Sequence, residues 1–524
     1  MSVCRNVRAD DLSVTTFHYD NQRTGWNSRE TVLTPANVAS ATFGRLWSTH
    51  LDGDVCGSPL YVAGVTINGV SRDIVYAATN ANTVYALDAL TGRILWGPVR
   101  VARPISDVAF TGSGDLKRPN GILSTPVIDL AHSRIYVCAL SQPGISQIYQ
   151  VWAIDITTGH IERGWPVLVH GSFLGCLFDA GQIDQRGALL LDNDGWLYIP
   201  FGARFDRPDW HGWIVGIDTN HPSAPERLWS PDPYDDGGGI WGVGGLSADS
   251  AGRLFAVIGN GANTFATGGK ELGQSIVRLE PTPHGLSIHY NASDCYVPSN
   301  VAYLNETDED LGGGGAALIT AHGDPSHRSL LITGGKEGVV YVVDQAHLGG
   351  LSGELYKKRY FGDPNTPDLG EIRAAPAYFD AGAAGQIVYV PGEDPGPDGE
   401  KGLVALQLSF GDSSQIQVAQ IWTLSQALAR PGSPAVSSNG AQDGIVWITE
   451  PDLSDENGPP MGELHAYDAL RGKELYNTEQ APQRDRLVHS RKFSAPVIVN
   501  GWVYVGVDGI DAYGLLPALK KVAQ

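Results

Sequence analysis

The sequence predicts an all-β fold, an eight-bladed β-propeller of four-stranded antiparallel blades, and three observations support this prediction. First, one phrase recurs along the chain at intervals of roughly sixty residues, which indicates a repeat architecture. Second, each repeat contains short runs of β-branched and aromatic residues, which are typical of strands. Third, the last repeat lacks its final strand, and a matching strand stands near the start of the chain. A ring closed in this way hides the edges of its sheets.

The third strand of each repeat gives the clearest signal, because in most repeats it ends in a hydrophobic residue followed by an acidic one. Eight such anchors occur, so we predict eight blades. They are Leu87–Asp88, Ile154–Asp155, Ile217–Asp218, Leu279–Glu280, Val343–Asp344, Leu406, Tyr467–Asp468 and Tyr513–Gly514. A second strand precedes each anchor, as in Ile74–Tyr76 and Leu254–Val257.

The first strand of most repeats follows a small residue and a proline. These starts are Ser58–Pro59, Thr125–Pro126, Ala375–Pro376, Ser433–Pro434 and Ala495–Pro496. In the third, fourth and fifth repeats the start is replaced by Gln185–Gly187, Gly239–Trp241 and Gly312–Gly315. A purely structural ring has no reason to change its repeat in three adjacent units, so these departures indicate a small-molecule site.

The two ends of the chain are expected to meet in the ring. The eighth repeat ends near Leu515 without a Trp-containing strand, and Phe43–Trp47 supplies one. We therefore expect residues 41–518 to form a single propeller domain and residues 1–40 to be an N-terminal extension packed on it. Met1–Asp20 lacks the features of a secretory signal, and no apolar run is long enough to span a membrane.

The composition argues against several classes of binding partner and cofactor. The formal net charge of −21 argues against DNA, RNA or an anionic membrane, because a phosphate-binding surface needs clustered Lys and Arg. The cysteines are widely separated and form no Cys-x-x-Cys motif, which excludes a covalently attached c-type haem and argues against a zinc finger. We expect a soluble protein that acts on a small molecule, and the oligomeric state stays open.

Three segments carry a resemblance to a known family. Phe17–Gly25, Leu33–Val38 and Val503–Gly506 resemble the quinoprotein alcohol dehydrogenases, and more closely their haem-free bacterial relatives, the PQQ-binding-like β-propeller repeat proteins. The resemblance covers nearly the whole chain and implies the fold more strongly than the function. It implies pyrroloquinoline quinone (PQQ) and Ca²⁺ as cofactors, oxidation of an alcohol or sugar, and a periplasmic or secreted location, although no signal peptide is visible.

The resemblance also implies roles for single residues. Trp241 corresponds to the floor on which the quinone stacks, Asn260 to an amide ligand of calcium, and Lys336 to a cation that binds the quinone carbonyls. Each residue has a structural alternative, which is a plug of the central channel for Trp241, an Asn–Gly turn for Asn260 and a solvated turn for Lys336.

Several positions depart from the family pattern. His211 replaces an Arg, and it serves either as a proton acceptor or as a hydrogen-bonded structural residue. The adjacent cysteine pair that covers the quinone is absent. Asp209 lies near the position of one expected calcium carboxylate. Glu271 stands in the loop where the carboxylate base is expected, so we assign Asn260 and Asp209 to the metal and Glu271 to catalysis.

Other charged residues are predicted at the same end of the ring. Arg186 and Arg373 precede first strands, and they either bind a carboxylate or phosphate or neutralise acidic loops. We assign Arg186 to catalysis and Arg373 to the cofactor. Asp308–Asp310 and Asp235–Asp236 predict an acidic rim that binds cations, supplies acid and base groups or is merely solvated.

Three functions follow from these assignments. The first is a PQQ-type oxidoreductase that uses Trp241 and Lys336 at one end of the channel. The second is a cofactor-independent lyase or hydrolase that uses His211, Arg186, Lys336 and a carboxylate in the same funnel. The third is a non-catalytic binding scaffold. The sequence does not identify the substrate.

Overall fold

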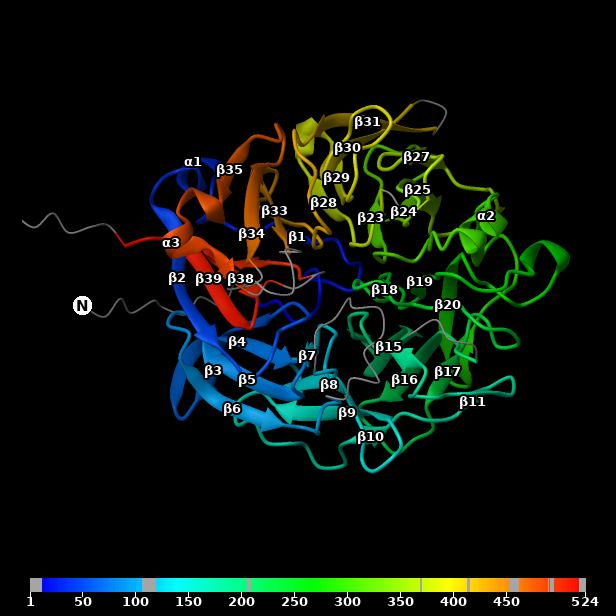
Figure 1. Ribbon diagram of the computed structural model, residues 1–524, viewed down its shortest axis with the longest axis horizontal. Helices are drawn as coiled ribbons and strands as arrows, with labels where there is room; N and C mark the ends of the chain where they lie inside the picture. The colour runs from blue at the N-terminus through cyan, green and yellow to red at the C-terminus, as the bar shows by residue number, and fades with distance from the viewer. Residues whose placement is uncertain are drawn as a thin grey trace, which may run out of the picture.

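The computed structural model describes residues 12–105, 119–204, 209–367, 370–411, 415–451, 461–488, 490 and 494–517. Eight of the nine sheets formed by these residues are mainly antiparallel and stand around a common axis as the blades of a propeller, and the ninth is a two-stranded sheet in a connection (Figure 1). Each blade runs outward from a short inner strand, and every predicted anchor lies in the third strand of its blade. The predicted all-β, eight-bladed fold is confirmed.

The first four blades use the following strands. Blade 1 contains β3 (Leu60–Ile67), β4 (Val70–Thr79), β5 (Thr83–Asp88) and β6 (Ile94–Arg100); blade 2 contains β7 (Val127–Asp129), β8 (Arg134–Ser141), β9 (Ile148–Asp155) and β10 (Val167–Leu168); blade 3 contains β14 (Leu190–Leu191), β15 (Trp196–Ala203), β16 (Trp213–Asp218) and β17 (Arg227–Trp229), with β13 (Ile183–Asp184) on β15; blade 4 contains β18 (Ser247–Ala248), β19 (Leu254–Val257), β20 (Ile276–Thr282) and β22 (Cys295–Val297), with β21 (Gly285–Ser287) and β26 (Gly350–Leu351).

The remaining four blades repeat this order. Blade 5 contains β23 (Ala317–Thr320), β24 (Ser329–Gly334), β25 (Val339–Asp344) and β27 (Tyr356–Arg359); blade 6 contains β28 (Ala377–Asp380), β29 (Gln386–Pro391), β30 (Leu403–Phe410) and β31 (Ile416–Thr423); blade 7 contains β32 (Ala435–Asn439), β33 (Gln442–Glu450), β34 (Met461–Asp468) and β35 (Glu474–Asn477), with β36 (Leu487–Val488); blade 8 contains β37 (Val497–Val499), β38 (Trp502–Gly506), β39 (Gly509–Leu515) and β2 (Phe43–His50).

The other elements lie in the connections. They are the strands β1 (Trp26–Asn27), β11 (Ser172–Phe173) and β12 (Cys176–Leu177), and the short helices α1 (Pro35–Val38), α2 (Val301–Glu306) and α3 (Pro482–Asp485), besides single turns of 3₁₀ helix at Phe265–Thr267, Gly382–Ala384 and Thr478–Gln480. No described helix has the length and apolar character needed to cross a membrane.

The ring closes as predicted, because the N-terminal strand β2 completes the C-terminal blade. It pairs antiparallel with β39 from Phe43 opposite Leu515 to His50 opposite Gly509. The short strand β1 adds a second closing contact by pairing parallel with β32 at the inner edge of blade 7.

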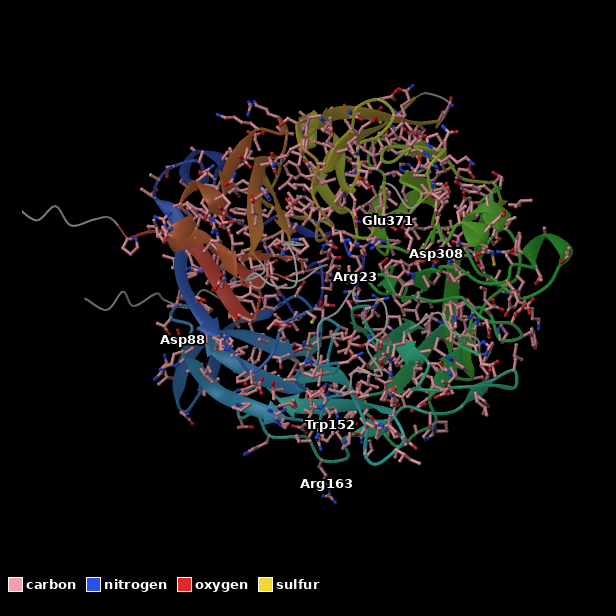
Figure 2. The ribbon with its side chains drawn as sticks, in the orientation of Figure 1. Arg23, Asp88, Trp152, Arg163, Asp308 and Glu371 are labelled. Carbon is pink, nitrogen blue, oxygen red and sulfur yellow. The ribbon has the colours of Figure 1, made fainter. Side chains whose placement is uncertain are left out.

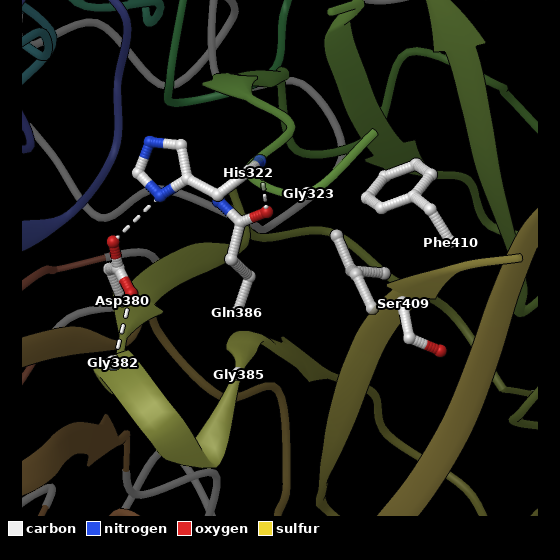
Figure 3. Close-up of a pocket in the computed structure, with 9 residues that line it drawn as sticks. His322, Gly323, Asp380, Gly382, Gly385, Gln386, Ser409 and Phe410 are labelled. Atoms are coloured by element: carbon white, nitrogen blue, oxygen red, sulfur yellow. Dashed lines mark hydrogen bonds and ion pairs between the residues drawn. The ribbon is translucent and has the colours of Figure 1, made fainter. Parts of the chain in front are cut away.

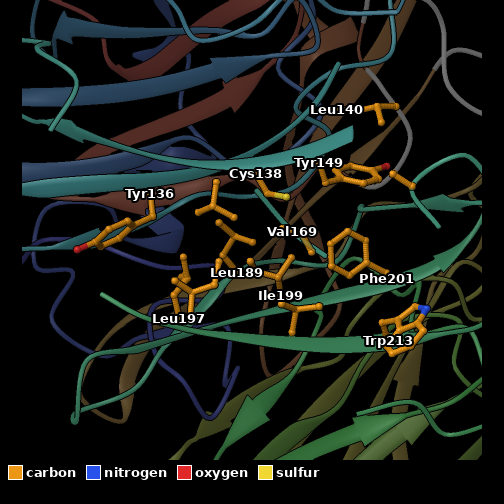
Figure 4. Close-up of a cluster of buried hydrophobic side chains, with 14 of the residues drawn as sticks. Tyr136, Cys138, Leu140, Tyr149, Val169, Leu189, Leu197, Ile199, Phe201 and Trp213 are labelled. Atoms are coloured by element: carbon orange, nitrogen blue, oxygen red, sulfur yellow. The ribbon is translucent and has the colours of Figure 1, made fainter. Parts of the chain in front are cut away.

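Hydrophobic layers between neighbouring blades form the core. Figure 4 shows the layer between blades 2 and 3, where Tyr136 and Tyr149 face Leu197, Ile199 and Trp213, and all five are at most 1% exposed. Burying one such side chain stabilises the fold by about 1.5–3 kcal/mol. The β-branched and aromatic repeats of the sequence therefore serve both faces of each sheet.

A recurring Trp of the fourth strand docks blades 8, 1 and 6 on the next blade. Its indole Nε1 donates to the carbonyl that follows the neighbouring anchor. These bonds are Trp47 to Ala89 at 3.1 Å, Trp96 to Ile156 at 3.0 Å and Trp422 to Ala469 at 2.9 Å. A tyrosine hydroxyl of the second strand shares each carbonyl, from Tyr504, Tyr76 and Tyr389. The recurring Trp after the anchor of a repeat thus marks a contact between neighbouring blades.

The glycine of the recurring Thr–Gly turn makes room for this Trp. Gly92 has a φ of +69°, and a Cβ built on it lies 2.5 Å from the Trp47 ring. In the next interface Gly159 has a φ of +73°, and its Cβ lies 3.0 Å from the Trp96 ring. Only glycine meets both demands at these turns.

The N-terminal segment threads along the inner strands of the whole ring. Its hydrogen bonds reach Tyr61, Ile128, Leu191, Ala248, Leu318, Tyr378, Val436 and Ile498, one residue in each of the eight blades. Arg23 is fully buried and donates to the carbonyls of Leu246 and Leu189 at 2.9 and 3.0 Å. Phe17 packs against Ala188, Ala375 and Ala495 from three blades. The division into residues 1–40 and 41–518 stays a prediction.

Candidate functional site

The predicted site residues lie in loops at one end of the propeller. Arg186, Trp241 and Arg373 precede inner strands, whereas Asn260 and Lys336 connect second strands to third strands. Because the strands of a blade are antiparallel, both kinds of loop emerge at the same end. The loops come from blades 3 to 6, which include the three blades whose first strands depart from the repeat.

Trp241 is half-buried and lies close to two cations. The guanidinium carbon of Arg186 is 5.3 Å from the Trp241 ring centroid, and the Lys336 Nζ is 5.5 Å from it. Both distances allow cation–π attraction. The buried Arg186 Nε makes no hydrogen bond. An aromatic face and an unpaired buried donor together form a suitable surface for a planar anion.

Close approach of glycine backbones places Trp241 in this position. A Cβ on Gly202 would lie 2.6 Å from the Trp241 Cβ, and a Cβ on Gly259 would lie 3.1 Å from its Nε1. A Cβ on Gly242 would meet the Gly312 carbonyl at 2.9 Å. The glycine runs that replace the repeat in blades 4 and 5 therefore allow their backbones to pack closely beside the tryptophan.

Lys336 is bound by two aspartates from the loop before β23. Its Nζ lies 2.7 Å from the Asp310 carboxylate and 3.2 Å from the Asp308 carboxylate. The Lys336 side chain is only 11% exposed, whereas that of Asp308 is 69% exposed. Burial lowers the pKa of Lys336, but Asp310 and Asp308 raise it more, so the net change is upward and the lysine is charged at neutral pH.

Asn260 joins the same group of side chains. Its backbone N–H donates to Asp310 at 2.5 Å, and its side-chain amide donates to Asp308. The amide of Gln274 donates to the Asn260 side-chain oxygen. One amide and two carboxylates thus gather at Lys336, and these are oxygen donors of the kind that hard cations prefer. Among the described residues, no group of three or more His, Cys, Asp and Glu side chains is arranged to hold a metal ion.

Arg373 belongs to a neighbouring ion-pair cluster rather than to the Trp241 ring. Its guanidinium pairs with Glu371, and its Nε lies 3.9 Å from Glu393. Arg430 lies 3.8 Å from Glu393 on the other side. Burial raises the pKa of Glu371, while the positive charges of Arg373 and Lys336 lower it in part. The charge of Lys336 therefore acts on a member of this cluster.

His211 and Glu271 lie in neighbouring loops and have other partners than Trp241 and Lys336. The His211 Nδ1 donates to the Asp232 carbonyl at 2.8 Å, which leaves Nε2 as the acceptor of the neutral ring. Glu271 accepts from the Thr264 hydroxyl at 2.6 Å. Asp209 is exposed, and its N–H donates to Asp236 at 2.8 Å. The structure therefore brings together Arg186, Trp241, Asn260 and Lys336, whereas His211, Glu271 and Asp209 bind other groups in the neighbouring loops.

Asp232 is a buried carboxyl group that the sequence did not single out. One oxygen accepts from the Ala262 N–H at 2.6 Å, and the other is buried without a hydrogen bond. Burial raises the pKa of Asp232 to about 8; the Ala262 N–H opposes this rise, and the Glu271 and Asp235 carboxylates add to it. The layer of loops next to the site thus holds an acid that is protonated at neutral pH.

The carboxylates that contact Asn260 are Asp308 and Asp310, which stand in the acidic stretch before Gly312–Gly315. The sequence predicts this stretch as a rim that binds cations, supplies acid and base groups or is merely solvated. The assignment of Glu271 to catalysis stays a prediction.

A separate pocket lies at the opposite end of the strands, between blades 5 and 6 (Figure 3). Its volume is about 390 Å³, and the ion pair between His322 and Asp380, with a distance of 2.9 Å, forms one wall. Leu408 and Phe410 lie among its apolar lining residues. It shares no residue with the Trp241 site.

Comparisons with known proteins agree with this architecture. A family model described as outer membrane protein assembly factor BamB matches residues 38–114. The dehydrogenase subunit of the alcohol dehydrogenase (quinone) of Acetobacter aceti is 23% identical over 553 residues, which cover 86% of this chain and 70% of that protein.

Two solved structures share the fold. The quinohemoprotein alcohol dehydrogenase ADHIIG from Pseudomonas putida HK5 has a TM-score of 0.60 and 16% identity, covering 98% of this chain and 82% of its own. The enzyme from Comamonas testosteroni has a TM-score of 0.59 and 15% identity, covering 99% and 84%. The chain therefore shares the propeller fold of these two structures, and it is similar in sequence to a quinoprotein alcohol dehydrogenase.

Proposed function

We propose that the protein is a PQQ- and Ca²⁺-dependent oxidoreductase that oxidises a hydroxyl group at the end of the propeller containing Trp241. The observation that supports this proposal most directly is the placement of Trp241 between the cations of Arg186 and Lys336. PQQ is a planar quinone with several carboxylates, so an aromatic face flanked by cations matches its shape and charge. Oxidoreductases of this kind also stand among its relatives.

The residues present fit both implied groups. Trp241 would stack on the quinone, and Arg186 has a buried Nε without a partner that is suited to a carboxylate. Asn260, Asp308 and Asp310 would hold the cation, with Lys336 beside it. When bound, PQQ supplies the acceptor for the two electrons that leave the substrate.

A residue of the chain would accept the proton of the substrate hydroxyl group. Asp308 is the exposed carboxylate of the group, and its backbone carbonyl and carboxylate both bind the Lys336 Nζ. We assign it the role of the base that accepts the hydroxyl proton of the substrate. Lys336 is charged and fixed, so it would stabilise negative charge that develops near Trp241.

Reconstitution tests this function. The purified chain is titrated with PQQ in Ca²⁺ buffer, and quenching of Trp fluorescence and the bound quinone absorbance are followed together with dye-linked oxidation of alcohols and sugars. We expect saturable quenching and turnover for the wild type. The Trp241→Ala variant should bind PQQ at least 10-fold more weakly than the wild type, because stacking on an aromatic face contributes on the order of 1–3 kcal/mol.

Trp152→Phe is the matched control, because Trp152 lies near the outer side of blade 2 (Figure 2). Its PQQ affinity should equal that of the wild type. Saturable binding that is equally strong in Trp241→Ala, or no binding by the wild type at all, would contradict the proposed site. We also propose a periplasmic or secreted location for this activity.

A further inference from the structure

Phe17 and Arg23 of the N-terminal segment lie among the loops that carry Arg186 and Trp241, and neither has yet been given a role in the site. These two residues are 2% and 0% exposed. Figure 2 shows Arg23 near the middle of the ring. Because protein interiors are close-packed, a large side chain at this point decides how closely the surrounding loops approach one another.

The cluster around Phe17 consists of apolar residues that stand next to the site in the sequence. In three blades the cluster residue follows a charged or aromatic residue of the site loops by two positions. These pairs are Arg186 and Ala188 in blade 3, Trp241 and Val243 in blade 4, and Arg373 and Ala375 in blade 6. Ala495 of blade 8 completes the cluster. The Phe17 ring therefore lies where the first-strand loops of blades 3, 4 and 6 meet.

Arg23 connects two of these loops through hydrogen bonds. Its Nε donates to the Leu246 carbonyl of blade 4 at 2.9 Å, and its Nη2 donates to the Leu189 carbonyl of blade 3 at 3.0 Å. Its Nη1 donates to the Phe17 carbonyl at 3.0 Å. One planar guanidinium thus joins the loop of blade 3, the loop of blade 4 and the N-terminal segment.

The loops of blades 3 and 4 also touch each other through their backbones. The Ala188 N–H donates to the Val243 carbonyl at 3.0 Å. A Cβ on Gly187 would lie 3.0 Å from the Gly245 Cα. Because the two backbones are in contact, a movement of one loop displaces the other. The distance of 5.3 Å between the Arg186 guanidinium and the Trp241 ring spans this contact.

We propose that Phe17 and Arg23 are positioning residues of the site, which fix the loop of Arg186 against the loop of Trp241. Loss of the phenyl ring leaves a space into which the loops relax, and loss of the guanidinium releases two buried carbonyls. A site whose supporting side chains are lost loses the precise geometry that binding needs. The consequence for PQQ binding rests on the proposed function, whereas the positioning itself requires no bound cofactor.

Fluorine NMR of the cofactor-free chain tests the positioning. The chain contains 13 Trp residues, and after labelling with fluorotryptophan the resonance of Trp241 is identified by its absence from Trp241→Phe. We expect this resonance to shift or broaden in Phe17→Ala and, to a smaller extent, in Phe17→Leu. Arg23→Lys keeps the charge but loses the planar fork of donors, so it should also shift the Trp241 resonance.

Val14→Ala is the matched control, because Val14 is another buried apolar residue of the N-terminal segment, with 1% exposed. It belongs to a different cluster, which includes Tyr61 and packs against Trp47. This variant should shift the Trp47 resonance, identified through Trp47→Phe, and leave that of Trp241 in place.

Two results would overturn the inference. One is a Trp241 resonance that moves as far in Val14→Ala as in the Phe17 variants, because the effect would then be general loosening. The other is a Trp241 resonance that stays at its wild-type position in both Phe17→Leu and Arg23→Lys. These two milder variants decide the question if Phe17→Ala does not fold.

Titration with PQQ measures the consequence for the proposed function. Phe17→Leu should bind PQQ about 10-fold more weakly than the wild type, since small displacements of a positioned group have effects of this order or larger, and Val14→Ala should bind it with wild-type affinity. Equal affinities of Phe17→Leu and the wild type would refute the positioning role and leave the oxidoreductase proposal standing. If the wild type binds no PQQ, the proposed function fails, and the fluorine spectra still decide whether Phe17 and Arg23 position Trp241.

Discussion

The regular and irregular blades use glycine and tryptophan in different ways. At the interfaces of blades 8 and 1, 1 and 2, and 6 and 7, a Trp ring seals the outer edge and donates to the next blade. In blade 4, Trp241 instead lies in the loop before the inner strand, between Arg186 and Lys336. The same residue type therefore serves as an interblade seal on one side of the ring and as an aromatic face at the proposed site on the other.

Buried polar groups are used in both regions. In regular interfaces one carbonyl, such as that of Ala469, accepts from both a Trp and a Tyr, here Trp422 and Tyr389. Buried polar atoms without a hydrogen bond occur in regular blades, as at the Trp152 Nε1, and on the irregular side, at the Arg186 Nε and one oxygen of Asp232. Only the last two belong to the loops of the proposed site, where a ligand or a proton transfer is expected to use them.

The largest expected effect comes from filling a docking turn. Gly92→Ala should lower the free energy of unfolding by about 2–4 kcal/mol, because it combines a left-handed φ with overpacking against the Trp47 ring. Gly268 in blade 4 has a similar φ of +80°, and a Cβ built on it has no neighbour within 4 Å. Gly268→Ala should therefore lower the free energy of unfolding by only about 1 kcal/mol. Urea denaturation measures both.

Equal losses in the two variants would contradict the view that glycine occupies this turn for the fit of the Trp ring. Only the backbone strain would then remain as an explanation. The two glycines form a matched pair because their φ values differ by little while their surroundings differ completely.

The second prediction concerns the buried acid of the irregular side. The pKa of Asp232 is raised to about 8 in the folded protein, so the folded state keeps a proton that the unfolded state releases near pH 4. Its contribution to stability is therefore present at low pH and is lost as the pH rises to about 8. Asp232→Asn does not titrate, so it should raise Tm relative to the wild type, with a difference that grows between pH 5 and pH 8.

Thermal unfolding at several pH values checks this prediction. Glu306→Gln is the control, because Glu306 is exposed at the end of α2. A Tm difference for Asp232→Asn that is constant over this pH range, or that has the opposite sign, would show that Asp232 is charged in the folded protein.

The fold was predictable because it rests on local signals that recur. The hydrophobic–Asp anchors, the Pro before the first strand and the displaced strand Phe43–Trp47 all correspond to strands in the expected places. The path of the N-terminal segment along all eight blades was not predictable, since most of these contacts join main-chain groups and carry no side-chain signature. Arg23, their buried centre, looks in the sequence like any exposed arginine.

The site was predictable only in part. Trp241, Asn260 and Lys336 were expected, and the structure brings them together with Arg186. The partners Asp308 and Asp310 follow Asn260 by about fifty positions in the chain, and the curvature of the ring, which brings adjacent blades into contact, decides that they meet. A sequence pattern within one repeat has no means of showing which loop of the next repeat lies beside it.

The smallest expected effect isolates the hydrogen bond of a docking Trp. Trp422→Phe removes the donor to the Ala469 carbonyl, which keeps the Tyr389 hydroxyl as a partner, so it should cost about 1 kcal/mol. Trp152→Phe removes a buried Nε1 that has no hydrogen bond, and it should be close to neutral. Urea denaturation resolves the difference. If both variants lost the same stability, ring volume rather than hydrogen bonding would explain why Trp recurs at the outer strands, and the seal of the regular blades would be a packing device alone.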